Sequence, residues 1–349
     1  MLKKSQEEII ANWGACDLSQ PLVSIKCTAY NHANYIEKAL DSFLMQETNF
    51  PFEVVVHDDA STDRTAEIIR EYEKAFPLII KPIYQRENLY SKDKKGMNTI
   101  IQAHMHGKYI AVCEGDDFWC DNSKLQKQAD ALESHPECSV SLCRVQFIEK
   151  DGNVLRRTAP EKGTLEQNIV TLEDYTREEY HKGQWTFHTS SLFYRACYNG
   201  PFYRAWENEY KNFPYGDMPL IIFLLSHGNG YFLPDTMSCY RTFSGGYNSF
   251  IKANPQVAVK HSEMLVKALQ DFDAMTEQKY HAHVVRKIAR EELFQSGKKK
   301  KKAQYAFELM KWKNIKNAGA RFVCYEFLTN ITPKLYAVYA GLRYGNKSK

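Results

Sequence analysis

The stretch that decides the fold is Val54-Val55-Val56-His57-Asp58-Asp59-Ala60-Ser61-Thr62-Asp63. Its three valines predict a strand that is buried on both faces of a parallel sheet. A helix is expected next, with Asp63 or Thr62 as its cap, because one face recurs at helical spacing at Thr65, Ile69, Tyr72 and Phe76. Asp58 and Asp59 therefore stand where a strand ends and a helix begins. In open α/β sheets this edge, at the carboxyl ends of the strands, binds ligands.

The same alternation continues on both sides of this stretch. Strands are expected at 22–28, 54–56, 77–84, 108–113 and 139–148, and helices at 36–44, 65–76, up to about 106, and at 123–134. The prolines in 77–84 are typical of a strand near an edge. After residue 148 the pattern becomes irregular, and we expect a loop-rich stretch as far as Asn212. This order predicts a doubly wound α/β sheet.

The composition favours a globular protein with an uneven charge. Apolar residues make up 44% of the chain, which argues against disorder. From Lys298 onward there are 13 basic and 2 acidic residues, a net charge of +11, while the remainder has 33 and 40, a net charge of −7. A basic tail on an acidic body indicates an anionic partner, which can be a membrane surface, a nucleic acid or another protein.

The cysteines and the hydropathy indicate where the chain works. Nine scattered cysteines without a C-x-x-C pair favour reduced thiols in the cytosol over a disulfide framework or a zinc site. The first residues lead into no long apolar core, and no uncharged apolar run reaches the length of a membrane span. We therefore expect a cytoplasmic protein, soluble or peripheral on the inner face of the membrane.

A second acidic cluster, Glu114-Gly115-Asp116-Asp117, follows the strand expected at 108–113. Gly115 permits a bend that brings both aspartates towards one ligand. Adjacent carboxylates repel each other unless a cation lies between them, and Mg²⁺ or Mn²⁺ with oxygen ligands would also bridge to a diphosphate. The alternative is that both acidic clusters are solvated loop residues.

Asp217 precedes Pro219 and the apolar run 220–225. It is either a helix N-cap or a general base held beside an apolar wall, and one carboxylate can serve in both roles. The histidines show no metal-ligand spacing. Three motifs are absent, namely G-x-G-x-x-G after the first strand, G-x-x-x-x-G-K-[ST] and G-x-S-x-G, which argues against a dinucleotide-binding domain, a P-loop NTPase and the usual hydrolase elbow.

Three segments occur in order, Thr28-Ala29-Tyr30-Asn31, Asp58 to Asp63, and Glu114 to Trp119. Together they resemble the nucleotide-binding half of a family 2 glycosyltransferase, and the resemblance covers roughly residues 21–250. It implies a GT-A fold with a mainly parallel central sheet. The implied organisation is a lead-in at 1–20, a nucleotide-sugar-binding half at 21–135, an acceptor-binding half at 136–250, and a basic helical extension at 251–349.

The resemblance also implies a role for single residues. Asp217 would be the catalytic base, and Asp117, with Asp116, the metal ligands. Asp59 would contact the uracil of a UDP-sugar, and the other donor-binding residues would be Thr28, Tyr30, Asn31, Asp58, Asp116 and Arg241. Arg241 lies in a segment, 240–246, that resembles a mobile loop closing over the diphosphate. His188 and Trp119 would lie on the acceptor side.

Two positions depart from the family pattern. Phe243 stands where many relatives have a histidine, which puts a third metal-side ligand in doubt. Gly96-Met97-Asn98 replaces the usual Ala-Arg-Asn, so a basic contact to the nucleotide must come from elsewhere. Lys92, Lys94 or Lys95 can substitute for it, or these lysines are merely solvated.

The implied activity is an inverting, metal-dependent transfer of a sugar from a nucleotide-sugar to a hydroxyl of a glycan or lipid-linked acceptor. A cell-surface polysaccharide, such as an O-antigen or a capsule, is the expected product. The basic tail would contact an anionic membrane or pack as a helical appendage, and no nucleic-acid module accompanies it. The alternatives are a catalytically silent nucleotide-sugar-binding scaffold and a sugar nucleotidyltransferase, for which no glycine-rich triphosphate loop is found.

Overall fold

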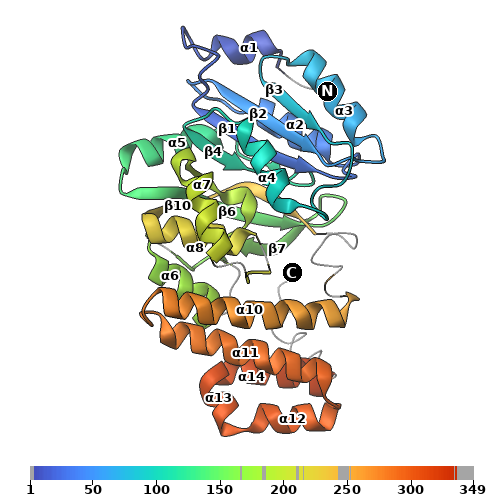
Figure 1. Ribbon diagram of the computed structural model, residues 1–349, viewed down its shortest axis with the longest axis vertical. Helices are drawn as coiled ribbons and strands as arrows, with labels where there is room; N and C mark the ends of the chain where they lie inside the picture. The colour runs from blue at the N-terminus through green and yellow to red at the C-terminus, as the bar shows by residue number, and fades with distance from the viewer. Residues whose placement is uncertain are drawn as a thin grey trace, which may run out of the picture. The chain divides into compact units, whose positions relative to one another are not determined.

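The computed structural model describes residues 4–165, 167–182, 186–209, 212–214, 216–242, 251, 253–333 and 335. The chain forms two compact units. Unit 1 consists of Met1–Tyr175, Gln184–Glu209 and Asp217–Phe243, and unit 2 of Thr176–Gly183, Tyr210–Gly216 and Ser244–Lys349. Unit 1 contains the sheet, whereas the described part of unit 2 is helical (Figure 1).

The sheet of unit 1 has ten strands in the order β3-β2-β1-β4-β9-β6-β10-β5, with β7 paired to β6 and β8 to β10. The strands are β1 (Val23–Ala29), β2 (Phe52–Asp58), β3 (Ile80–Tyr84), β4 (Tyr109–Val112), β5 (Phe118–Trp119), β6 (Cys138–Ile148), β7 (Val154–Ala159), β8 (Ile169–Val170), β9 (Phe193–Arg195) and β10 (Asn229–Arg241). The first four are mutually parallel, and β3 is an edge strand, as predicted. Antiparallel pairing begins at β9, so the sheet is mixed and the parallel expectation holds for its first half.

Helices of unit 1 pack on both faces of this parallel half. They include α1 (Gln6–Ala11), α2 (Ile36–Leu44), α3 (Thr65–Ala75), α4 (Lys94–Ala103) and α5 (Lys124–Ser134). Val54 and Val56 pack in one core with residues of α2, α3 and α5. Val55 points to the other face and packs with Met97 and Ile101 of α4. The prediction that β2 is buried on both faces is therefore confirmed, and the cause is the alternation of side chains along a strand.

The expectation of a loop-rich stretch from 151 to 212 was wrong. This stretch contains β7, β8 and β9 together with α6 (Leu172–Thr176), α7 (Pro201–Glu209), a π-helical turn (Arg177–Lys182) and two 3-10 turns (Thr189–Ser191 and Ala196–Tyr198). Most of these elements are too short to show a hydrophobic period, because a period needs several repeats to stand out. The apolar helix predicted after Asp217 is present as α8 (Asp217–His227).

Unit 2 contains α10 (Pro255–Met275), α11 (His281–Lys299), α12 (Lys302–Met310), α13 (Trp312–Ala318), α14 (Ala320–Glu326) and a π-helical turn (Phe327–Ile331). A small core joins α11 to α14, built from Ala289, Leu293, Tyr305, Leu309, Ala318 and Val323. Over the residues that the structure describes, no helix combines the length and the apolar character that a membrane span requires.

Candidate functional site

The three segments singled out in the sequence meet at one edge of the sheet of unit 1. β1 pairs in parallel with β2 on one side and with β4 on the other, so their carboxyl ends are neighbours. The amide of Asp59 donates to the carbonyl oxygen of Ala29 at 2.9 Å, and the amide of Gly115 donates to that of Thr28 at 2.9 Å. The predicted convergence of these segments is confirmed. This is the edge at which α/β sheets bind ligands.

The corner after β1 is held by Asn31. Asn31 and Ala60 have left-handed backbones, with φ of 55° and 61°. The Asn31 side-chain oxygen accepts from the Thr62 amide at 2.8 Å, and the Asn31 amide donates to Ser61 Oγ at 2.9 Å. Asn31 therefore fastens two loops together, while the neighbouring Tyr30 is exposed and open to a ligand.

Asp58 and Asp59 are equally buried, each 3% exposed, but their carboxylates differ in what they bind. The two oxygens of Asp59 accept from the backbone amides of Leu89 and Tyr90, at 2.7 and 2.9 Å. Oδ2 of Asp58 accepts from the Ser61 amide at 3.4 Å, and Oδ1 accepts no hydrogen bond within the described residues. Asp59 thus anchors the loop that follows β3, and Asp58 is the aspartate with a spare buried oxygen.

Behind the edge lies a polar group that had no role assigned from the sequence. The Thr28 hydroxyl donates to Glu114, and Lys26 Nζ donates to Asn98 Oδ1 at 2.9 Å. Burial raises the pKa of the Glu114 carboxyl and lowers the pKa of the Lys26 ammonium. The available signal was Lys26 itself, which is the one charged residue of β1. Asn98 comes from the segment that replaces the family's Ala-Arg-Asn.

The second acidic segment places one oxygen without a partner at the same edge. Asp117 is almost fully buried, and its Oδ1 accepts from the Arg241 amide at 2.9 Å. Its Oδ2 accepts no hydrogen bond from the described residues and lies 3.9 Å from Nδ1 of His188. Burial raises the pKa of the Asp117 carboxyl well above its ordinary value. Asp116 Oδ2 lies 3.9 Å from Nε2 of His32.

These oxygens fit a divalent cation in part. An unpartnered buried carboxylate oxygen is costly unless a proton or a cation compensates it, and hard cations prefer oxygen ligands. Among the described residues, however, no three His, Cys, Asp or Glu side chains are arranged to hold a metal ion. Asp117 and Asp116 are the described carboxylates that would contribute oxygens to such an ion.

Gly115 has a packing reason in addition to the predicted bend. A Cβ built on it would lie 3.0 Å from His32 Nδ1 and 3.0 Å from Ile36 Cδ1. These contacts are tighter than ordinary van der Waals distances. A side chain at this position would push the acidic segment away from the start of α2.

Arg241 is buried at the end of β10 and already has partners. Its guanidinium donates to the carbonyl oxygens of Asp116 at 3.1 Å and Lys150 at 2.7 Å, and it lies 4.8 Å from the Tyr35 ring. Its role as a phosphate ligand stays a prediction, and these backbone contacts count against it. Phe243 and the rest of the segment 243–246 lie outside the described residues.

The two residues expected on the acceptor side are also buried. His188 Nδ1 accepts from the Ser190 amide at 3.2 Å, and burial lowers the pKa of the imidazole to about 3. Trp119 is 4% exposed, and its ring lies 4.7 Å from that of Phe43 in the core of unit 1. A contact between Trp119 and an acceptor is at odds with this burial. His188 lies beside Asp117, and its acceptor role stays a prediction.

Asp217 is the first residue of α8, in unit 1. Its Oδ1 accepts from the Met218 amide at 2.9 Å, so the carboxylate helps to satisfy the start of the helix. Burial raises the pKa of the Asp217 carboxyl above its ordinary value. A carboxylate with a raised pKa is a better proton acceptor, which is what a general base requires. The contact at the start of the helix is present, and the role as general base stays a prediction.

The three candidate lysines make other contacts. Lys95 donates to Asn208 of α7, and Lys92 Nζ lies 2.5 Å from Glu87. Lys94 Nζ lies 4.9 Å from the centre of the Tyr90 ring. It therefore stays a prediction that one of these lysines contacts the nucleotide in place of the missing family arginine.

The fold defines an α/β protein with a cluster of buried carboxylates at the carboxyl edge of a partly parallel sheet. Residues 24–201 match the family described as glycosyl transferase family 2. This match covers half of the chain, and the chain belongs to that family. The mixed α/β fold of unit 1 agrees with the α/β class that the resemblance implied.

The chain is also similar to curated proteins from two bacteria. The uncharacterized protein Rv1520 of Mycobacterium tuberculosis is 33% identical over 228 residues, which is 64% of this chain and 60% of the relative. The poly(ribitol-phosphate) beta-N-acetylglucosaminyltransferase TarS of Staphylococcus aureus is 29% identical over 153 residues, which is 42% of this chain and 25% of TarS. The chain thus spans about 60% of the length of the first of these relatives.

Among solved structures, residues 1–349 of Staphylococcus aureus TarS in complex with UDP-GlcNAc match with a TM-score of 0.49 and 16% identity, over 88% of this chain and 91% of that one. The mannosyltransferase PcManGT of Pyrobaculum calidifontis, in complex with GDP-Man and Mn²⁺, matches with a TM-score of 0.47 and 18% identity, over 92% of this chain and 91% of that one.

Proposed function

We propose that this chain transfers a sugar from a nucleotide-sugar, with UDP as the expected nucleotide, to a hydroxyl group of a glycan or a lipid-linked acceptor. The observation that carries the proposal is the pair of spare buried oxygens, Asp58 Oδ1 and Asp117 Oδ2, at the carboxyl edge of β1, β2 and β4. Two buried carboxylates without compensation destabilise a fold, and they are retained where a ligand supplies the missing partner.

The donor would bind at this edge. Thr28, Tyr30 and Asn31 would line the base and ribose from the end of β1. Asp58 would offer its spare oxygen to a donor group of the nucleotide. Asp59 would act on the base through the loop that it anchors, since both of its oxygens already accept backbone hydrogen bonds.

The proposed chemistry is an inverting displacement in which Asp217 is the base. Asp217 accepts the proton of the acceptor hydroxyl, the hydroxyl oxygen forms a bond to the anomeric carbon, and the bond from that carbon to the diphosphate oxygen breaks. A divalent ion held by Asp116 and Asp117, Mn²⁺ or Mg²⁺, would offset the charge of the departing diphosphate. The raised pKa of Asp217 supports the base assignment.

The acceptor is proposed from the family and the relatives. TarS is named as a poly(ribitol-phosphate) beta-N-acetylglucosaminyltransferase. We extend to this chain only the class, a surface polysaccharide or its lipid-linked precursor, such as that of an O-antigen or a capsule, with His188 as the candidate residue near the acceptor. The proposal locates the reaction at the cytoplasmic face of the membrane, where the free thiols of all nine cysteines are stable.

The first experiment is a calorimetric titration of the purified chain with UDP, GDP and CDP, each with Mn²⁺ and with a chelator. We expect UDP to bind in a metal-dependent way, and turnover to follow with one member of a panel of UDP-sugars. Asp117→Asn should lose metal-dependent binding. Asp217→Asn should retain binding and lose turnover by about 100-fold or more.

Asp235→Asn is the matched control, because Asp235 is an exposed aspartate of β10 whose partner is Lys127, at 3.2 Å. It should behave as the unaltered chain. Full activity of Asp217→Asn would refute the base assignment. Failure of every nucleotide to bind would refute the transferase, whereas nucleotide binding without turnover of any sugar donor would favour the nucleotide-sugar-binding scaffold.

A further inference from the structure

Helix α12 of unit 2 presents apolar side chains on two opposite faces. Tyr305 and Leu309, four residues apart, are buried in the small core of this unit. Phe307 and Met310 point away from it and are 63% and 59% exposed. With Ala303 they follow the spacing i, i+4 and i+7, which places them along one stripe of the helix. This second face has no apolar partner within the described residues.

The next helix begins with another exposed apolar side chain, that of Trp312. It is the first residue of α13 and is 75% exposed. Trp312, Phe307 and Met310 fall within six residues of one another, and we refer to these three side chains as the α12–α13 patch. Single exposed apolar residues are normal on proteins, but a cluster that includes tryptophan and phenylalanine marks an interaction surface.

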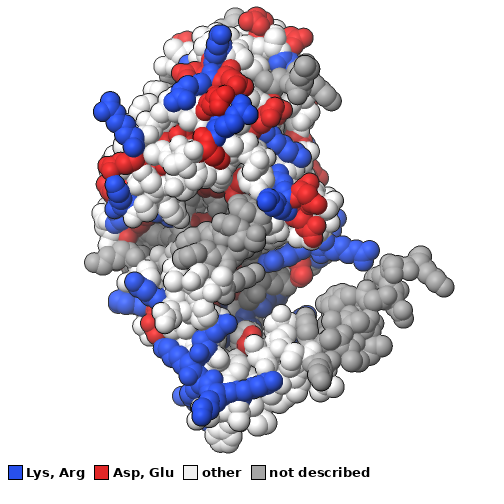
Figure 2. All heavy atoms as spheres, turned by 90° about the vertical axis from the view of Figure 1, so that its right-hand side faces the viewer, with Lys and Arg blue, Asp and Glu red and all other residues white. Residues whose placement is uncertain are grey.

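Lysines surround the α12–α13 patch. Lys300 and Lys301 precede α12, Lys302 is its first residue, and Lys311, Lys313 and Lys316 follow it. Glu308 is the only acidic residue between positions 298 and 325. In Figure 2, Lys and Arg side chains gather over the end of unit 2 that carries these helices, beside neutral surface.

The charge of Glu308 is offset by two of these lysines. Its carboxylate oxygens lie 2.7 Å from Lys300 Nζ and 2.8 Å from Lys311 Nζ, and these contacts hold the pKa of the carboxyl down to about 2. Lys301, Lys302 and Lys313 are exposed, and none of them forms an ion pair in the part of the chain that the structure describes. The surface around the patch is therefore strongly cationic.

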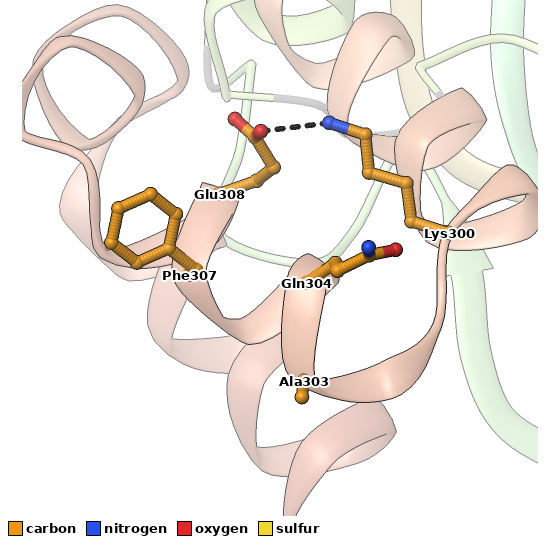
Figure 3. A pocket seen from close by; sticks show the side chains of 5 residues that line it. All are labelled: Lys300, Ala303, Gln304, Phe307 and Glu308. Atoms are coloured by element: carbon orange, nitrogen blue, oxygen red, sulfur yellow. Dashed lines mark hydrogen bonds and ion pairs between the residues drawn. The ribbon is translucent and has the colours of Figure 1, made fainter.

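A hollow of about 450 Å³ opens beside Phe307, lined also by Lys300, Ala303, Gln304 and Glu308. Figure 3 shows Lys300 and Glu308 joined across one side of it. The Phe307 ring and the Lys300 ammonium thus border the same hollow. A lipid offers a matching pair of groups, an acyl chain for the ring and a headgroup phosphate for the ammonium.

We propose that the α12–α13 patch docks on a membrane surface rich in anionic phospholipid. Phe307, Met310 and Trp312 enter the boundary between headgroups and acyl chains, and the lysines contact lipid phosphates. Aromatic side chains favour this boundary, and each lysine near an anionic surface adds attraction. A second copy of this chain is a poorer occupant, since two such patches facing each other would bring lysines against lysines.

The test is binding of the full chain to vesicles of phosphatidylcholine alone and of phosphatidylcholine with phosphatidylglycerol. We expect binding to the anionic vesicles only, and weaker binding as salt is raised. The double variant Phe307→Ala/Trp312→Ala should bind about 100-fold more weakly, since each buried aromatic contributes about tenfold or more. The control Leu78→Ala/Phe202→Ala removes two exposed apolar residues of unit 1 and should bind normally.

A second measurement reads the patch directly. Quenching of tryptophan fluorescence by lipids brominated in the acyl chain should be strong in the unaltered chain and should disappear in Trp312→Phe, which still sediments with the vesicles. Equal binding by the double variant and the control would overturn the proposal. So would a patch-dependent dimer in sedimentation velocity without vesicle binding. The proposed nucleotide site lies in unit 1, so calorimetric binding of UDP should be the same in all variants. A failure of the membrane proposal can therefore be distinguished from a failure of the proposed transferase function.

Discussion

Asp59 offers the sharpest test of what the carboxyl edge does, because its carboxylate is buried and holds two backbone amides. We consider Asp59→Asn, which keeps the shape of the side chain and replaces one oxygen with an NH₂ group. An asparagine can accept from only one of the two amides, those of Leu89 and Tyr90. The other amide then faces the NH₂ group of the asparagine, which is also a donor, and no hydrogen bond can form between them. The loop after β3 should detach from the edge on that side.

The magnitude follows from the two contacts. At 2.7 and 2.9 Å they have the lengths of charge-assisted hydrogen bonds, and each such bond contributes about 1.5–3 kcal/mol. Asp59→Asn loses one of them and weakens the other. We therefore expect the free energy of local opening to fall by about 2–3 kcal/mol, which corresponds to a 30- to 150-fold increase, roughly, in the fraction of open loop.

The assay is hydrogen exchange at the amides of Leu89 and Tyr90, together with urea unfolding of unit 1. Asp58→Asn is the matched control, since Asp58 is equally buried and the hydrogen bond that its carboxylate accepts from the Ser61 amide is long at 3.4 Å. It should change exchange at Leu89 and Tyr90 little and cost under about 1 kcal/mol.

The two variants also separate positioning from direct binding. If Asp59 acts through the loop, UDP affinity and amide protection should fall together in Asp59→Asn. The reasoning would be refuted if exchange at these amides stayed slow in Asp59→Asn, or if both variants accelerated it equally. A loss of UDP affinity with unchanged protection would show that Asp59 contacts the base itself.

Three further predictions concern other buried groups. Lys124→Met should raise the melting temperature of the chain, because the Lys124 ammonium is fully buried with Gln128 as its hydrogen-bond partner and burial lowers its pKa. Gly107→Ala should cost about 3 kcal/mol or more in urea unfolding, since a Cβ there would lie 2.4 Å from the backbone nitrogen of Ser24. The rate of sugar transfer should fall as pH drops through the raised pKa of Asp217, at a higher pH than the ordinary value of about 4 for an aspartate, and Asp217→Asn should abolish this acid limb in a pH–rate profile.

The features that the sequence predicted correctly are those with a strong local signal. Three valines in a row strongly favour a strand that is buried on both faces, and β2 is buried throughout. The neighbouring strand β4 is also buried throughout, and β1 is buried except at Lys26 and Thr28, which are partly buried. Once three parallel strands are accepted, the meeting of the segments at 28–31, 58–63 and 114–117 follows from topology alone, without knowledge of any side-chain contact.

The features that were missed depend on long-range partners. The loop that Asp59 holds comes from the polar stretch 85–98, and the groups that bind it are backbone amides, which every residue except proline carries. No side chain in that stretch predicts the contact. The short strands β7, β8 and β9 are similar, because they owe their conformation to pairing with β4, β6 and β10 rather than to a pattern of their own.

For Arg241 the sequence predicted the location correctly, whereas the role as a phosphate ligand stays a prediction. An arginine at the end of a strand beside two aspartates is typical of a phosphate ligand, and the structure does bring it to that edge. Its backbone amide, however, holds Asp117, and its guanidinium holds the carbonyl oxygens of Asp116 and Lys150. The first contact would survive any substitution except proline, whereas the others require the planar guanidinium. The residue therefore orders the acidic segment through its backbone and its side chain separately, and a role towards phosphate would require the side chain to leave its present carbonyl partners.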